Sequence, residues 1–214
     1  MSKWPDILSK LLEKGVDVNH VVLEGQTPLH AAAYRAGHEN QVVRLLLDNG
    51  ADPNVTTRSG STALHIAVEG YGDTSTAEML LSAGANINAS DRNGATALLF
   101  SCRWSENIEI VQLLLSHGAD VNTGTAGPTT WYPIHAACDA RHYDIAKLLL
   151  EYNADVNVRA ESCKGALHCA TESATRQRPG NDAGSALTPV YLAPLYTVVS
   201  ALDGKRIVLL NCCN

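Results

Sequence analysis

The chain has 214 residues, of which 45% are hydrophobic and 18% are charged, and its formal net charge is −6 at pH 7. This composition is that of a folded globular protein and argues against a disordered chain. The acidic balance argues against a nucleic-acid-binding protein, which would show clustered Lys and Arg. No apolar run reaches the roughly 18 residues of a membrane span, and the first residues hold no signal-peptide stretch. We therefore expect no membrane association, a location in the cytoplasm or nucleus, and reduced cysteines.

A short string that closes on Asn returns five times along the chain. Its closing residues are Asn19, Asn54, Asn88, Asn122 and Asn157, at steps of 35, 34, 34 and 35 residues. A second string runs in phase with the first and reads QTPLHAA, STALHIA, ATALLFS, WYPIHAA and KGALHCA. Two motifs that recur in register indicate a repeat architecture.

The first predicted element is an amphipathic helix at residues 4–14, and four more helices of this kind follow. The five helices contain, in order, the strings ILSKLLEKG, VVRLLLDNG, AEMLLSAG, IVQLLLSHG and IAKLLLEYN. Each has aliphatic residues at i, i+3 and i+4 and stops at Gly or Asn, which tolerate a positive φ. The TPLH string begins a shorter helix, for which Thr27 is the expected cap and Pro28 the first residue. Each unit is therefore predicted as turn, short helix, longer helix and turn.

These motifs resemble the ankyrin repeat, which carries TPLHxA, LLLxxGADVN and a Gly before the Thr. The resemblance covers residues 4–170. It implies an all-α solenoid of about five stacked helix–turn–helix units with β-hairpin loops. The expected units are 4–19 (partial), 20–54, 55–88, 89–122, 123–157 and 158–170 (partial). It also implies a protein that binds other proteins without catalysis.

The repeat pattern fails beyond Thr171. Residues 171–186 are polar and contain Pro179 and Gly180, which predicts a flexible loop. Residues 187–214 begin with a string that resembles the start of a further short helix. However, Pro194 follows, and the pattern of the second, longer helix of a repeat unit does not come after it. We expect a degenerate or capping segment there, and fraying of the outer units, because neither end carries a clear polar cap.

Four histidines, His30, His65, His135 and His168, recur once per unit. Units stacked about 10 Å apart would keep these rings from sharing one substrate. We interpret them as structural groups that hydrogen-bond the hairpin and the helix start and so tie adjacent units together. The cysteines lack zinc-ligand spacing, and the chain has no phosphate-binding or catalytic motif. We expect no catalytic residues, no metal and no cofactor.

The resemblance implies two kinds of site. Asn122 and Asn157 resemble the pattern of hydroxylated asparagines in ankyrin repeats. A partner is expected on the concave face, where hairpin tips and short-helix ends vary between units; Trp, Tyr and Arg are favoured there as interface hot spots. The candidate partner-binding residues are Tyr34, Arg35, Arg58, Glu69, Tyr71, Arg92, Arg103, Trp104, Trp131, Tyr132, Asp139 and Arg141. Their mixed charge predicts a folded or mixed-charge protein partner rather than a polyanion.

The sequence favours a non-catalytic interaction module or adaptor. An alternative is a substrate-recognition fragment of a ubiquitin ligase, but the expected C-terminal box is not visible after Thr171. A second alternative is an enzyme or its regulatory segment. Any catalytic site would then have to lie in residues 171–214, which are too few to build one.

Overall fold

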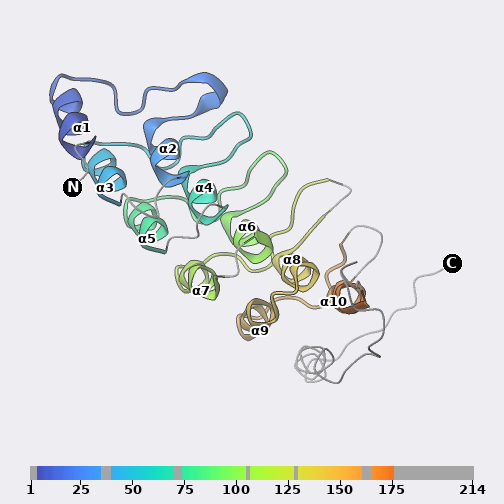
Figure 1. Cartoon of the computed structure of the whole chain (residues 1–214). Coiled ribbons are helices and arrows are strands. Elements are labelled where there is room, and N and C mark those ends of the chain that lie inside the picture. The colour runs from blue at the N-terminus through green and yellow to red at the C-terminus, as the bar shows by residue number, and fades with distance from the viewer. Residues whose placement is uncertain are drawn as a thin grey trace, which may run out of the picture.

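The computed structural model describes residues 4–34, 40–69, 74–104, 107–127, 130–160 and 165–175. These residues form a row of helix pairs joined by projecting loops (Figure 1). The α-helices are α1 (Trp4–Glu13), α2 (Pro28–Tyr34), α3 (Asn40–Asp48), α4 (Ala63–Glu69), α5 (Thr74–Ser82), α6 (Ala97–Trp104), α7 (Ile108–Ser116), α8 (Pro133–Ala140), α9 (Tyr143–Glu151) and α10 (Ala166–Thr175). A short 3-10 helix, η1 (Leu23–Gly25), lies in the first loop.

The helices lie in two layers. The even-numbered helices, α2 to α10, pack one on the next and form an inner layer, from whose side the loops project (Figure 1). The odd-numbered helices, α1 to α9, pack in the same way and form an outer layer. Each inner helix from α2 to α8 also packs on the outer helix that follows it in the chain. This arrangement confirms the predicted all-α repeat solenoid.

The outer helices end where the sequence predicts. Gly15, Gly50, Gly84, Gly118 and Asn153 follow them with φ between 63° and 88°. Gly and Asn adopt this left-handed conformation at low cost, so the chain can turn sharply out of each helix. The turn carries the chain toward the hairpin of the next unit.

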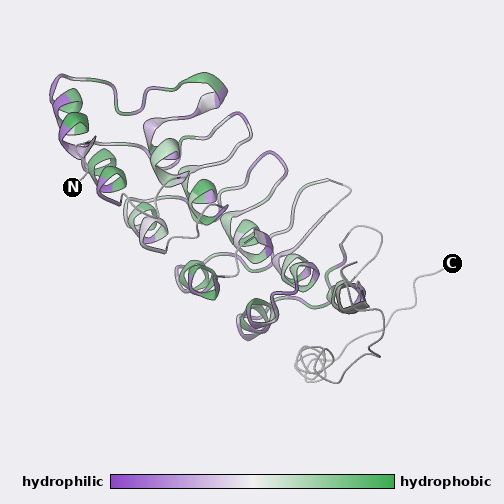
Figure 2. Cartoon of the chain, viewed as in Figure 1, coloured by the Kyte–Doolittle hydropathy of each residue, from purple (hydrophilic) through white to green (hydrophobic). Residues whose placement is uncertain are grey.

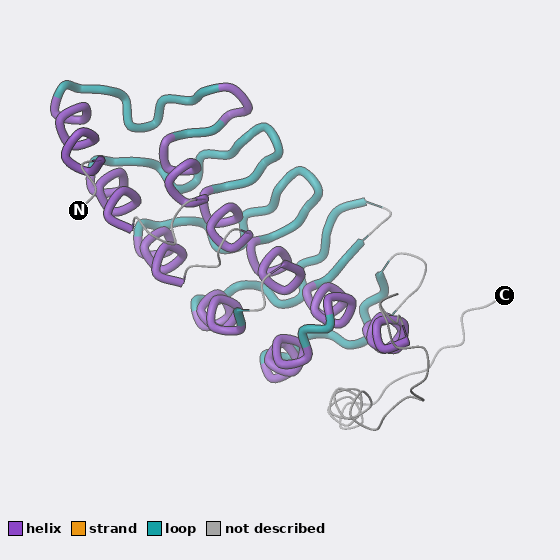
Figure 3. The backbone as a smooth tube through the Cα atoms, in the orientation of Figure 1, coloured by secondary structure: helices purple, strands orange, loops and turns teal. Residues whose placement is uncertain are grey.

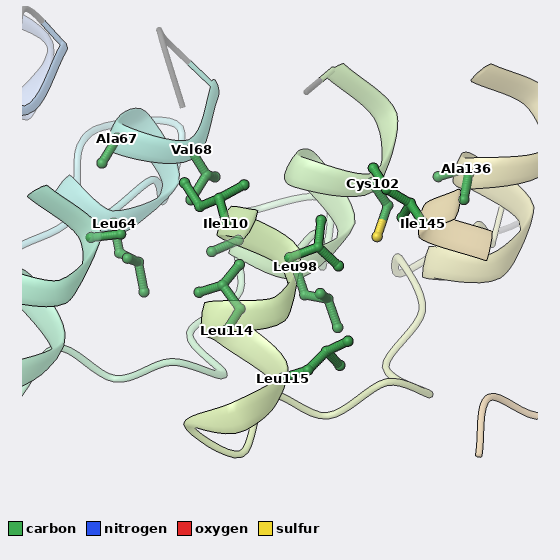
Figure 4. Close-up of a cluster of buried hydrophobic side chains, with 14 of the residues drawn as sticks. Leu64, Ala67, Val68, Leu98, Cys102, Ile110, Leu114, Leu115, Ala136 and Ile145 are labelled. Atoms are coloured by element: carbon green, nitrogen blue, oxygen red, sulfur yellow. The ribbon is translucent and has the colours of Figure 1, made fainter. Parts of the chain in front are cut away.

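The core is a continuous line of aliphatic side chains between the two layers. Leu64 and Leu98 from the inner layer and Leu80 and Leu114 from the outer layer are at most 1% exposed. Figure 4 shows Leu64, Leu98 and Leu114 in this cluster, and Figure 2 shows hydrophobic residues on helices of both layers. Burying one such side chain contributes about 1.5–3 kcal/mol. Because each unit repeats this pattern, the core extends along the whole stack.

The loops are hairpins with very little sheet. Backbone hydrogen bonds close them between the pairs Val22–Gln26, Thr57–Ser61, Asp91–Ala95 and Thr125–Trp131. An isolated antiparallel bridge joins Ser90 to Thr96. The described part of the chain contains no β-strand longer than this bridge (Figure 3).

Neighbouring hairpins are joined through their backbones. The Arg58 N–H donates to the Glu24 carbonyl at 2.8 Å, and the Arg92 N–H donates to the Ser59 carbonyl at 2.9 Å. Gly60 permits the second contact: its φ is +84°, and a Cβ there would lie 2.7 Å from the Arg92 nitrogen. The Gly before the repeat Thr is therefore needed for two reasons, its left-handed φ and the close approach of the next hairpin.

The repeat-closing asparagines also join the units. The Asn54 side chain donates to the Gly84 carbonyl at 3.0 Å and accepts from the Asn86 N–H at 2.7 Å. The Asn19 side chain bonds the next turn in the same way. Each amide thus satisfies two backbone groups of the following unit, which would otherwise depend on water.

The ends of the array differ in part from expectation. On α1, Ile7 is 46% and Leu11 is 48% exposed. The last helix, α10, runs to Thr175, five residues beyond the predicted end of the array at 170. Helix formers such as Glu172 and Ala174 allow this extension. The rest of the predicted loop, 176–186, and all of the segment 187–214 lie outside the described residues.

Candidate functional site

Two of the four repeated histidines, His30 and His65, act as structural ties between units, whereas His168 is exposed. The Thr62 N–H and hydroxyl lie 3.1 and 2.8 Å from the His65 Nδ1. His65 Nε2 lies 3.1 Å from the Ala95 carbonyl of the next hairpin. Because the carbonyl can only accept, Nε2 carries the proton and Nδ1 accepts. His30 repeats this geometry with Thr27 and Ser61, so the structural interpretation is confirmed for both rings.

The predicted role of Thr27 as a helix cap is wrong in one respect. Its hydroxyl bonds the His30 ring instead of a helix N–H. Among the three described repeat-start threonines, the predicted geometry occurs at Thr96, where the histidine is missing: Leu99 replaces it in α6, and the Leu99 N–H donates to the Thr96 hydroxyl at 3.4 Å. A ring nitrogen within reach therefore competes successfully with the helix backbone for the Thr side chain.

Burial keeps these imidazoles neutral. It lowers the pKa of His30 and His65, and their bonds to backbone carbonyls oppose that shift only in part. Desolvation also lowers the pKa of His135. The rings of His30 and His65 are neutral, buried and held at both nitrogens, so they suit a structural tie and have no free nitrogen for proton transfer.

In the α8–α9 unit the repeat histidine is surrounded in a different way. Tyr132 stands where the three preceding units have Thr, and among the described residues neither ring nitrogen of His135 has a hydrogen-bond partner. Aromatic edges surround the ring instead, with centroids of Trp131 at 6.3 Å and of Tyr132 at 5.6 Å. Gly124 makes room for Tyr132, because a Cβ there would lie 2.9 Å from the phenol ring. Tyr132 is thus half-buried between the hairpin and the helix.

The described cysteines are buried free thiols, Cys102, Cys138 and Cys169. Burial, with smaller contributions from Cys169 and Asp139, raises the pKa of Cys138 to about 12. Burial likewise raises the pKa of Cys102. Thiols of this kind are unreactive and pack as small apolar groups. No cluster of metal-ligating side chains occurs among the residues that the structure describes.

A groove lies beneath the hairpins between α2 and α4 of the inner layer, and we call it the inner groove. Between α2 and α4 its volume is about 490 Å³. Tyr34 and Glu69 lie on its edge, Ile66 on its floor, and Thr57 and Ser59 on the hairpin wall. Arg58 also lines it and forms an exposed ion pair with Glu24 at 3.2 Å. An exposed pair of this kind adds little stability.

Further along the inner layer, Arg103 lies between two indole rings. Its guanidinium carbon is 5.0 Å from the centroid of Trp104 and 5.8 Å from that of Trp131. Trp104 is 61% exposed, whereas Trp131 is half-buried against the core. Both indoles lie within cation–π distance of the guanidinium, and these contacts restrain the Arg103 side chain. The structure thus brings together three of the predicted binding residues.

A comparison with protein-family models matches the ankyrin repeats (3 copies) over residues 1–91, 29–125 and 71–160. These matches together span residues 1–160, about three-quarters of the chain. The chain belongs to the ankyrin repeat family. Ankyrin repeats generally act as protein–protein interaction modules and are typically non-catalytic. No curated protein matches the sequence.

The other predicted partner-binding residues are spread over the ankyrin array. Arg92 is exposed at a hairpin tip, and Asp139 is exposed at the end of α8. Arg141 follows α8 in the left-handed conformation, with a φ of 66°. Arg35 and Tyr71 lie outside the described residues. The partner-binding role of all these residues stays a prediction.

The groove floor was missed by the sequence analysis. Ile66, on the groove floor, occupies the position after the repeat histidine, where α2 and α8 have Ala31 and Ala136. The half-buried Phe100 occupies the equivalent position in α6, outside the groove. Phe100 also meets the edge of the His65 ring at a centroid distance of 5.8 Å. A large residue at a position that is small in α2, α8 and α10 was the signal that could have found Ile66.

The two predicted hydroxylation residues are exposed at the turns between units. The Asn122 side chain accepts from the Asp155 N–H at 2.8 Å, so it serves as a unit-joining amide. The Asn157 N–H donates to the Asp155 carboxylate at 2.9 Å. Their hydroxylation stays a prediction.

Proposed function

We propose that this chain is a non-catalytic adaptor that binds a protein partner along its inner layer, through Arg103 and Trp104. The observation that carries the proposal is the stacked arrangement of Arg103 between Trp104 and Trp131. An exposed indole beside an oriented guanidinium combines two residue types that dominate interface hot spots, and its ordering cost is already met in the free protein.

A location in the cytoplasm or nucleus belongs to this proposal. Cys102, Cys138 and Cys169 are free thiols, which suits a reducing compartment. Within the described residues, no helix has the length and apolar character required to cross a bilayer. The ubiquitin-ligase alternative gains no support from any described contact, and the sequence after Thr171 contains no recognisable recruiting box.

Site-specific photo-crosslinking in cells tests the proposal. A photoreactive aromatic residue is placed at Ser59, on the groove wall, or at Gln112, which is exposed on outer helix α7. We expect one protein to crosslink in stoichiometric amounts from position 59 and not from position 112. The crosslink should fall about tenfold when Arg103→Ala and Trp104→Ala are added.

The matched control is Arg44→Ala, which removes an exposed arginine from outer helix α3. It should leave the crosslink unchanged, and circular dichroism should show that all variants are folded. Crosslinking from position 112 alone, or a crosslink that survives loss of Arg103 and Trp104, would show that the partner binds elsewhere.

A further inference from the structure

An aromatic and an acidic side chain from neighbouring units meet at the inner groove. Tyr34 ends α2, Glu69 ends α4, and both residues line the groove. Each lies seven residues after the repeat-start threonine of its unit, so the two occupy equivalent positions on adjacent inner helices. Helices α2 and α4 pack on each other, and packed helices lie about 8–10 Å apart. The two side chains therefore project from positions that are about one such interval apart.

Glu69 carries the charge that the groove lining leaves unbalanced. The charges of Glu24 and Arg58 offset each other, since their side chains form an ion pair at 3.2 Å. His30 is neutral and is held at both ring nitrogens. The Glu69 carboxylate is exposed, and within the described residues it takes part in no ion pair and no hydrogen bond. The groove thus has a net negative charge and favours a cation.

Tyr34 offers a second contact for that cation, because its side chain is 63% exposed. A guanidinium binds an aromatic ring within about 6 Å of the centroid, and it pairs with a carboxylate within about 4 Å. Together these two distances span the interval between neighbouring helices, so one arginine side chain can contact both Tyr34 and Glu69. Arginine suits the position better than lysine, because the face of its planar group stacks on a ring while its edge binds both oxygens of a carboxylate.

The hairpin wall of the groove is suited to a peptide backbone. The hydroxyls of Thr57 and Ser59 lie 2.8 Å apart, and those of Ser59 and Ser61 lie 3.1 Å apart. These two bonds use two of the three hydroxyl hydrogens, so the third is left to donate to a carbonyl. The groove volume of about 490 Å³ is close to that of one helical turn, roughly 500 Å³ from the dimensions of a helix. The groove therefore holds a short segment.

We propose that the inner groove binds a short protein segment that bears an arginine. The guanidinium stacks on Tyr34 and pairs with Glu69, and the backbone of the segment lies against the hydroxyls of the hairpin wall. Binding balances the charge of Glu69 and leaves Arg58 paired with Glu24. This inference rests on the proposed function, a protein partner along the inner layer, and specifies the side chain that the α2–α4 part of that layer receives.

A displayed library of random 12-residue peptides, selected on the full chain, tests the inference. We expect the selected peptides to share an arginine. Fluorescence anisotropy of a labelled peptide should show that Tyr34→Leu weakens binding about threefold and that Glu69→Gln weakens it about fivefold. Replacing the peptide's arginine by glutamine should cost about 15-fold on the original chain. The same replacement should cost only about threefold on the Glu69→Gln chain, because the ion pair is already absent there.

Glu151→Gln is the matched control. Glu151 is also an exposed glutamate at the last residue of its helix, α9, and its substitution should leave peptide binding unchanged. Both variants should stay folded, because each removes a negative charge from the C-terminal end of a helix, where such a charge is unfavourable. Circular dichroism checks this.

Four outcomes would overturn the inference. They are selected peptides without a shared arginine, including acidic ones; binding that Glu69→Gln leaves unchanged; an equal loss in Glu151→Gln; and a library that yields no binder.

The double variant Arg103→Ala, Trp104→Ala separates this inference from the proposed function. It should leave the arginine peptides bound, because neither residue lines the inner groove; a loss would place the peptides at Arg103 and overturn the inference. Arginine peptides that bind while the crosslink from position 59 fails would support the groove site and contradict the proposed function. A crosslink without any arginine preference would do the reverse.

Discussion

At the scale of single residues, the Thr–His pairs show how a repeat motif becomes a joint between units. His65 links its own helix start to the following hairpin through both ring nitrogens. The histidine role was predictable from its recurrence, whereas the Thr role was not, because the Thr hydroxyl can bond either a ring nitrogen or a helix N–H. The natural replacement by Leu99 shows which partner the hydroxyl takes when the ring is absent.

The buried histidines predict a loss of stability in mild acid. The pKa values of His30, His65 and His135 are lowered in the folded chain, while the unfolded chain titrates near pH 6.5. Below that pH these histidines bind more protons in the unfolded chain than in the folded chain. The free energy of unfolding should therefore be highest above about pH 7 and fall as the pH drops below 6.5.

Urea unfolding at pH 7.5, 6.5 and 5.5 measures this slope. His65→Leu copies the solution found in α6 and should reduce the pH dependence by roughly a third, since it removes one of three buried rings. Leu99→His is the converse variant and should steepen it. A slope that neither variant changes would mean that other groups control the acid sensitivity.

At the scale of the element, most of the features that could not be predicted from the sequence lie in or beside the hairpins. Helix ends at Gly50 and Asn153 follow from local chemistry and were predictable. The inner groove was predictable only in part: Tyr34 and Glu69 were found by their variability, but Ile66 was missed because it resembles a core residue in a helix pattern. The Arg103–Trp131 contact joins different units, so no local pattern contains it.

Two glycines with the same φ provide a test of hairpin stacking. Gly60 and Gly50 both have a φ of +84°, but only at Gly60 would a Cβ meet a neighbouring backbone, that of Arg92. Gly50→Ala should cost about 1 kcal/mol from backbone strain alone, and Gly60→Ala about 2–3 kcal/mol. Chemical denaturation gives both values. Equal losses of unfolding free energy in the two variants would mean that the close packing of neighbouring hairpins does not stabilise the fold.

At the scale of the whole molecule, each unit contacts only its neighbours, so stability varies along the stack. The middle helices α4, α6 and α8 are packed on both sides within the inner layer. Helix α1 packs on α3 and leaves Ile7 and Leu11 about half-exposed. The outer units should therefore open before the middle ones.

Amide hydrogen exchange followed by mass spectrometry should resolve this order. We expect peptides from α1 to exchange first and those from α6 and α8 last, with opening free energies that differ by about 2–3 kcal/mol. Ile7→Lys should leave the exchange of α6 unchanged, whereas Leu80→Ala, at a fully buried position, should speed exchange in the adjoining units. Uniform exchange along the chain would show instead that the array opens as one body.

The joints made by Asn54 and its equivalents also determine how the protein responds to force. Each joint consists of a few short hydrogen bonds and a patch of apolar contact, repeated at every step of the stack. Tension applied to the two ends would act on these joints in series and would separate the weakest first. An array built in this way lengthens in steps of one unit and can recoil by restacking on the units that remain.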